Sequence, residues 1–188
     1  WVDDLRFVLD EAELLNDGSI PSIFTNKLDL TRVGFFGHST GGGAVIEACY
    51  LDDRCKAGLT EDAGMVPFSR EMVTTGLVQP FFFMQSENWS GERNTLMFNT
   101  LFENQRSPAY QFVINGSKHY DFTDIPMLTP LAPLIGLKGP INAQRGLSII
   151  NTYTVAFFDQ TLRNTPSPLL AGQSLDYPET IFTSKNIQ

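Results

Sequence analysis

The chain has 188 residues, of which 42% are hydrophobic and 12% aromatic, so it can bury one substantial core. Its 21 acidic residues outnumber 13 basic ones, and no basic cluster interrupts that balance. This charge pattern argues against a nucleic-acid-binding surface. No apolar run approaches the length of a membrane span, so no transmembrane segment is predicted. These features leave the chemistry and the oligomeric state of the protein open.

Helical and strand patterns alternate along the chain. Residues 1–12 carry apolar side chains at helical spacing, and after a loop over 18–26 come an apolar strand at 33–36 and a helix at 42–51. Further elements are predicted as strands at 56–60, 80–84 and 110–114 and as helices at 95–104 and 141–162. Such alternation predicts an α/β fold with a mainly parallel sheet and helices on both faces.

The segment 125–140 interrupts this order, because it holds four prolines and two glycines. It is too irregular for a helix or a strand. Two interpretations stay open at this point, a border of the substrate cleft and a plain surface connection.

A Gly-x-Ser-x-Gly pattern occupies Gly37–Gly41, between the predicted strand and the helix that follows it. In this context the pattern indicates a serine nucleophile held on a sharp turn, here Ser39. Gly37 and Gly41 are expected where a side chain would collide with the neighbouring strand or helix. The backbone N–H of Thr40, at the start of the helix, is the predicted first donor of an oxyanion hole.

A serine nucleophile needs a base, and histidine is the usual one. The chain has two histidines. His38 adjoins Ser39 in sequence, so its side chain is expected to point away from the nucleophile and to act in packing. His119 follows the predicted strand at 110–114 and is expected at the same carboxyl edge as Ser39, which makes it the candidate base.

The third member of the triad is a carboxylate that orients the histidine. Asp62 and Glu87 both follow predicted strands, and the usual order of this architecture favours the later one, Glu87. Asp121 and Asp124 lie so close to His119 in sequence that they are expected to cap the following helix. The residues alone therefore leave the choice between Asp62 and Glu87 open.

A set of spaced blocks covers most of the chain up to about Asp124 and carries a family resemblance. The blocks are Gly37–Gly42, Asp53–Gly58, Asp62 with Pro67, and Gly116–His119 with Phe122 and Asp124. In this combination the chain resembles the platelet-activating-factor acetylhydrolase family of α/β-hydrolases. The resemblance implies a serine esterase with nucleophile Ser39, acid Asp62 and base His119, and it leaves Glu87 as the reserve acid. Gly64 departs from the family pattern, where a bulky aromatic residue is expected.

The second oxyanion donor of such enzymes normally comes from a loop after an early strand. No such strand and loop are identified before Ser39. We therefore expect residues 1–188 to form a single α/β-hydrolase domain that is the C-terminal part of a larger sheet, with the N-terminal strands and the oxyanion loop absent from this chain.

Two cysteines, Cys49 and Cys55, lie six positions apart at the end of the predicted helix. The spacing fits a disulfide and a pair of buried thiols equally well. A disulfide would favour a secreted or extracytoplasmic location, and the localisation is otherwise not predicted. Neither cysteine has metal-ligand spacing, and the expected chemistry requires no metal or organic cofactor.

The function predicted from these residues is hydrolysis of short acyl esters through an acyl-enzyme, with acetyl phospholipids among the substrates that the resemblance suggests. The partner is accordingly a small-molecule or lipid ester, and Trp89 is a candidate substrate contact. One alternative is a polyester- or cutinase-like hydrolase. The other, from a different class, is a non-catalytic binding module that keeps the α/β-hydrolase fold.

Overall fold

The computed structural model describes residues 1–65, 69–89 and 91–187, so Pro67 of the family resemblance lies outside the described residues. The strands form one five-stranded sheet in the order β1-β2-β3-β4-β5. Their bounds are Val33–His38 (β1), Cys55–Glu61 (β2), Phe81–Ser86 (β3), Ala109–Ile114 (β4) and Thr180–Lys185 (β5). The first four strands run parallel and β5 pairs antiparallel with β4. The predicted α/β fold with a mainly parallel sheet is thus confirmed.

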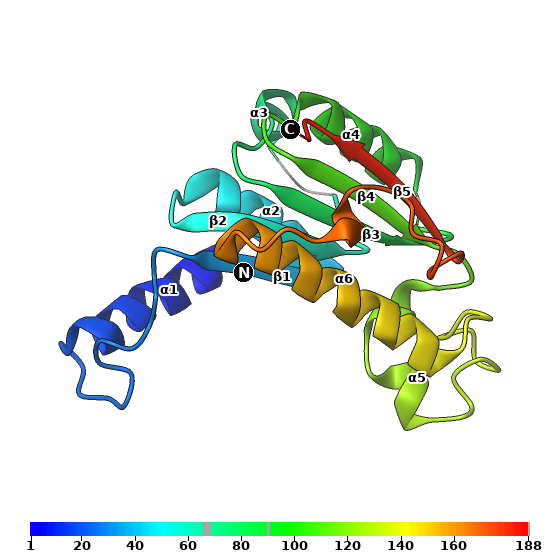
Figure 1. The fold of residues 1–188 in the computed structure, drawn as a ribbon, viewed down its shortest axis with the longest axis horizontal. Coiled ribbons are helices and arrows are strands. Elements are labelled where there is room, and N and C mark those ends of the chain that lie inside the picture. The colour runs from blue at the N-terminus through cyan, green and yellow to red at the C-terminus, as the bar shows by residue number, and fades with distance from the viewer. Residues whose placement is uncertain (66–68, 90, 188) are drawn as a thin grey trace.

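Helices cover both faces of this sheet (Figure 1). Their bounds are Val2–Asp17 (α1), Thr40–Leu51 (α2), Arg70–Thr75 (α3), Glu92–Asn104 (α4), Ile125–Leu128 (α5) and Ala143–Arg163 (α6), with 3-10 turns at His119–Phe122 (η1) and Pro168–Leu170 (η2). The long helix α6 crosses one face, whereas α2, α3 and α4 contribute to the core on the other. α1 extends away from the sheet at the β1 side.

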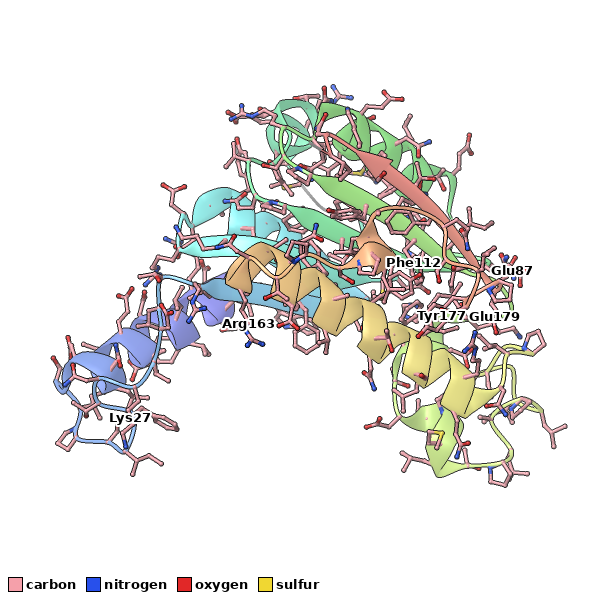
Figure 2. All side chains as sticks on the ribbon, viewed as in Figure 1. Lys27, Glu87, Phe112, Arg163, Tyr177 and Glu179 are labelled. Atoms are coloured by element: carbon pink, nitrogen blue, oxygen red, sulfur yellow. A yellow bond between two sulfur atoms is a disulfide. The ribbon has the colours of Figure 1, made fainter. Side chains whose placement is uncertain are left out.

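The sheet separates two hydrophobic cores because its central strands are buried on both faces. Phe83 of β3 packs edge-to-face on Phe98 of α4, with ring centroids 5.3 Å apart. On the opposite face Phe112 of β4 lies against Tyr153 of α6, with centroids 4.2 Å apart (Figure 2). This double burial fixes the strands whose carboxyl ends carry the candidate site.

Arg54 fastens α1 to the rest of the molecule. Its guanidinium binds Asp52 at 2.7 Å and reaches Asp10 and Glu13 of α1 at 2.7 and 3.0 Å. Arg54 holds the pKa of the buried Asp52 carboxyl down to about 2. The attachment of α1 therefore combines these ion pairs with apolar contacts, since Leu9 is buried and Leu5 packs against the core.

A disulfide joins Cys49 of α2 to Cys55 of β2, with Cα atoms 5.1 Å apart. The bridge closes the short connection at Asp52, which also holds Arg54. Of the two states that the spacing allowed, the structure contains the disulfide.

The structure adds elements that the sequence pattern did not predict. In β5 the apolar residues Ile181 and Phe182 are adjacent instead of alternating, so the strand lacks a period of two; only Phe182 packs on the α6-side core. Within 125–140, expected to be irregular throughout, residues Ile125–Leu128 form the single helical turn α5. The remainder consists of turns.

Candidate active site

Ser39 lies between β1 and α2 in a backbone conformation that L-residues rarely adopt, with φ 57° and ψ −123°. The turn is held from both sides, because the Ser39 N–H donates to Glu61 O at 2.8 Å while Ser39 O accepts from Gly43 N at 3.1 Å and from Gly64 N at 2.9 Å. Such strain persists only where the surroundings fix it, and it is typical of a nucleophile elbow.

The glycines around Ser39 differ in what they permit. A Cβ at Gly37 would lie 2.7 Å from the Gly41 carbonyl group, and one at Gly42 would lie 2.7 Å from Gly37 O. At Gly41 a Cβ would meet nothing within 4 Å among the described residues. The expected collision therefore holds for Gly37 and is wrong for Gly41. Gly42 provides the second close contact between α2 and the strand.

Three side chains from distant parts of the sequence meet at the carboxyl edge of the sheet. His119 Nε2 lies 3.0 Å from Ser39 Oγ, and His119 Nδ1 lies 3.1 Å from Asp62 Oδ2. Ser39 follows β1, Asp62 follows β2, and His119 opens η1 after β4. Serine, histidine and carboxylate in this order have the geometry of a nucleophile, its base and the group that orients the base.

Asp62 is held by the end of the neighbouring strand. Its side chain is buried, and Oδ1 accepts from Ser86 N while Oδ2 accepts from Ser86 Oγ, both at 2.6 Å. The Asp62 N–H donates to Met84 O, and the residue has a positive φ of 45°. Sequence reasoning missed Ser86. Its only signal was its place at the end of β3, beside the strand that carries Asp62.

Glu87 has a different partner. Its Oε2 accepts from Gly116 N at 2.9 Å, which ties the end of β3 to the loop after β4. In that same loop, Asn115 N donates to the Glu179 carbonyl. The Glu87 carboxylate thus bonds this loop, while Asp62 contacts His119; the acid implied by the family resemblance, and not the one that strand order favoured, lies beside the candidate base.

His38 has a polar contact that the sequence did not suggest. Its Nε2 lies 2.9 Å from the backbone oxygen of His119, and the two rings lie 4.4 Å apart. Burial, followed by the charge of His119, lowers the pKa of His38. The expectation that His38 acts only in packing is therefore incomplete, since its ring is also bonded to the main chain of the candidate base.

Thr40 begins α2 directly after Ser39. Among the described residues, no hydrogen-bond acceptor is assigned to its backbone N–H. The first N–H groups of a helix lack partners within the helix, and the helix dipole favours negative charge there. The Thr40 N–H is thus available to an oxygen bound beside Ser39.

A cleft of about 380 Å³ opens beside Ser39 and His119. Trp89 lines it with its indole Nε1 donating to Ala63 O at 3.1 Å, so the ring has a fixed orientation. Gly64 also lines the cleft, and among the described residues a Cβ there would meet Ser39 O alone within 4 Å, at 3.9 Å. Asn88, Asn94 and Lys118 add polar groups to the lining. The lining of the cleft thus combines one aromatic side chain with several polar ones.

Glu61, which precedes Asp62, is a buried acid. Burial, with a further contribution from the Asp62 charge, raises the pKa of Glu61 to about 7.

No group of three or more metal-ligating side chains occurs within the described ranges. In the same ranges, no helix has the length and apolar character needed to cross a bilayer.

A strained serine after one parallel strand, with its acid and base after later strands of the same sheet, defines the α/β-hydrolase class. A ferulic acid esterase from Streptomyces cinnamoneus has a similar structure, with a TM-score of 0.79 and 26% identity over 97% of this chain and 53% of the esterase. Residues 11–166 match the family described as platelet-activating factor acetylhydrolase, isoform II. The chain belongs to that family, which confirms the resemblance found in the sequence.

Individual relatives agree with this membership. A platelet-activating factor acetylhydrolase of Cavia porcellus is 29% identical over 72% of this chain and 31% of its own length. A probable 1-alkyl-2-acetylglycerophosphocholine esterase of Arthroderma benhamiae is 31% identical over 80% of this chain and 43% of its own length. The chain thus spans about a third of the length of the first relative and less than half of the length of the second.

Proposed function

We propose that the protein containing this chain is a serine carboxylic ester hydrolase that works through an acyl-enzyme. The observation that carries the proposal is the hydrogen-bonded series from Ser39 through His119 to the buried Asp62. Histidine held by a carboxylate on one nitrogen presents the other as a base to the serine hydroxyl. The strained turn of Ser39 and the start of α2 supply the exposed hydroxyl and one oxyanion donor.

In this mechanism Ser39 Oγ attacks the ester carbonyl carbon while His119 Nε2 takes the hydroxyl proton. The Thr40 N–H stabilises the oxyanion, and Asp62 stabilises the imidazolium that His119 becomes. As the tetrahedral adduct collapses, His119 returns the proton to the departing alcohol oxygen. Water then attacks the acyl-Ser39 ester with His119 again as base, which releases the acid and restores the serine.

For the substrate we propose short acyl esters, with acetyl phospholipids as the leading class. The names of the acetylhydrolase and acetylglycerophosphocholine esterase relatives support this choice. The cleft supports it as well, because Lys118 and two asparagines place polar groups close to Ser39, where the headgroup of a phospholipid could bind. An insoluble polyester offers no anionic group for Lys118.

The test uses the full-length protein, a fluorophosphonate probe and p-nitrophenyl acetate. We expect the probe to label the wild type and not Ser39→Ala, and we expect His119→Ala to lose turnover. Persistent labelling of Ser39→Ala would refute the assignment of the nucleophile. A folded wild type that binds acetyl phospholipid without hydrolysing it would instead indicate a non-catalytic binding module, and a preference for insoluble polyester would indicate the cutinase-like alternative.

Two carboxamide variants test the acid separately. Asp62→Asn should lower kcat by as much as about 10,000-fold, because the orienting carboxylate is lost. Glu87→Gln is the matched control, since its partner is the Gly116 N–H and not His119. A larger loss in Glu87→Gln than in Asp62→Asn would reverse the assignment.

A further inference from the structure

His119 stands on a short loop, and its main chain is held by side chains from elsewhere. It opens η1, a turn of only four residues, so few helical hydrogen bonds fix its position. The His119 side chain must nevertheless meet Ser39 and Asp62 at once. Because a displacement of about 1 Å can cost on the order of 100-fold in rate, the anchoring of this peptide matters for the chemistry.

One anchor lies on the N-terminal side of His119. The buried Asp121 accepts from Lys118 N at 2.8 Å and from Gly139 N at 2.7 Å, both through Oδ2. Asp121 was expected to cap a following helix. It instead joins the peptide before His119 to the chain at Gly139, eighteen residues further on.

The other anchor is His38, at the end of β1. Its Nε2 lies 2.9 Å from His119 O, and β1 is itself hydrogen-bonded along its length to β2. A carbonyl oxygen only accepts, so Nε2 carries the proton and the His38 ring donates. The His119 carbonyl is thus tied to a strand of the sheet and not only to its own loop.

We propose that His38 is a positioning residue, whose neutral ring donates from Nε2 to the His119 carbonyl and thereby sets the position of the catalytic imidazole between Ser39 and Asp62. This inference rests on the proposed esterase function. His38 acts through His119 and touches no reacting atom.

Two features favour the neutral form of the His38 ring, although the charged ring could also donate from Nε2. Burial, and then the charge of His119, lower the pKa of His38, which favours the neutral ring. The rings lie 4.4 Å apart, so the imidazolium formed on His119 during turnover opposes a second positive charge on His38. His38 therefore donates to the His119 carbonyl as a neutral ring.

The competing explanation is that His38 only fills space, since its ring also stacks on Phe122 with centroids 6.3 Å apart. Two substitutions separate the explanations. His38→Phe keeps an aromatic ring and removes the donor. His38→Gln keeps an N–H donor at a similar reach and removes the ring. A packing role therefore predicts that Phe is tolerated, whereas a positioning role predicts that Gln is.

The experiment measures kcat and KM for p-nitrophenyl acetate in the full-length wild type and both variants, with thermal unfolding as a check of folding. We expect His38→Phe to lower kcat by about 10- to 100-fold with KM nearly unchanged, and His38→Gln to stay within about threefold of the wild type. If the Phe variant fails to fold, His38→Leu replaces it under the same criteria. The proposal would be overturned if His38→Phe, or His38→Leu in its place, kept its turnover while His38→Gln lost it.

A second readout needs no substrate. The low-field proton NMR signal of His119 Nδ1–H, bonded to Asp62, should be present in the wild type and His38→Gln and weakened or lost in His38→Phe. An unchanged signal in His38→Phe would contradict the positioning role even if the protein hydrolysed no ester. The opposite result is also informative. If the wild type shows no Ser39-dependent turnover but the NMR signal is lost only in His38→Phe, the esterase proposal fails and the positioning role of His38 stands.

Discussion

Ser86 offers a direct test of how Asp62 supports His119, through the substitution Ser86→Ala. The side-chain hydroxyl donates to Asp62 Oδ2, the same oxygen that faces His119 Nδ1, and the distance is 2.6 Å. The Ser86 backbone N–H, bonded to Oδ1, is unaffected by the change. The substitution thus removes one of the two hydrogen bonds that Ser86 makes to the carboxylate and leaves the other in place.

The size of the effect follows from burial and charge. A hydrogen bond to a charged group contributes about 1.5–3 kcal/mol, which corresponds to roughly 10- to 150-fold in rate if it is lost entirely from the transition state. Because the backbone bond to Asp62 remains, we expect a loss near the lower end, about 10-fold in kcat. KM for p-nitrophenyl acetate should change little, since the hydroxyl bonds the acid and not the ester.

Ser117→Ala is the matched control. Ser117 is equally buried, and its hydroxyl donates to the Ile114 carbonyl at 2.7 Å without touching Asp62. Both variants lose one buried serine hydroxyl near the same sheet edge, so their thermal unfolding should be similar while their kcat values differ. Equal losses of kcat in the two variants, or a Ser86→Ala enzyme within about twofold of the wild type, would refute this reasoning.

Three further predictions concern stability, measured by urea unfolding. The pKa of Glu61 is raised from 4.5 to about 7, so between these values the folded state binds more protons than the unfolded state and stability falls as pH rises. Glu61→Gln should reduce this change in the free energy of unfolding by up to about 3 kcal/mol. If the free energy of unfolding of the variant and of the wild type varied with pH in parallel, the prediction would be wrong. Replacing Cys49 and Cys55 together by Ala should cost roughly 2 kcal/mol because the loop is short, with kcat unchanged; an equally stable variant would argue against the bridge. Arg54→Met should cost about 1–2 kcal/mol, because the buried Asp52 loses the guanidinium at 2.7 Å and keeps only that of Arg6, at 3.5 Å; an unaltered urea midpoint would contradict the ionic part of the attachment of α1.

The sequence was most informative where a local pattern has one structural solution. The glycine pattern around Ser39 sits between an apolar strand and a helix, and the parallel sheet follows from the alternation of elements. His119 could be selected because the only other histidine adjoins the nucleophile. These inferences required residue identity and order along the chain, and no knowledge of contacts.

The residues that support the site were harder to find because their partners are distant or are backbone atoms. His38 bonds a carbonyl 81 residues away, and Ser86 bonds Asp62 across neighbouring strands. Asp62 and Glu87 both follow strands, so composition and spacing could not separate them without the family resemblance. β5 went unpredicted because its pairing with β4, and not an alternating pattern, stabilises it.

The unequal space around Gly37, Gly41 and Gly42 has a consequence for how this sequence can vary. A saturation library at Gly37 or Gly42 should return almost only glycine, because any side chain would push α2 away from β1 and move Ser39 with it. Gly41 borders a hollow lined by Leu5 and Phe36, and among the described residues a Cβ at Gly41 meets no atom within 4 Å. Within this part of the fold, a small side chain at Gly41 would therefore leave Ser39 in place, and searches that require glycine at both ends of the motif would overlook such variants.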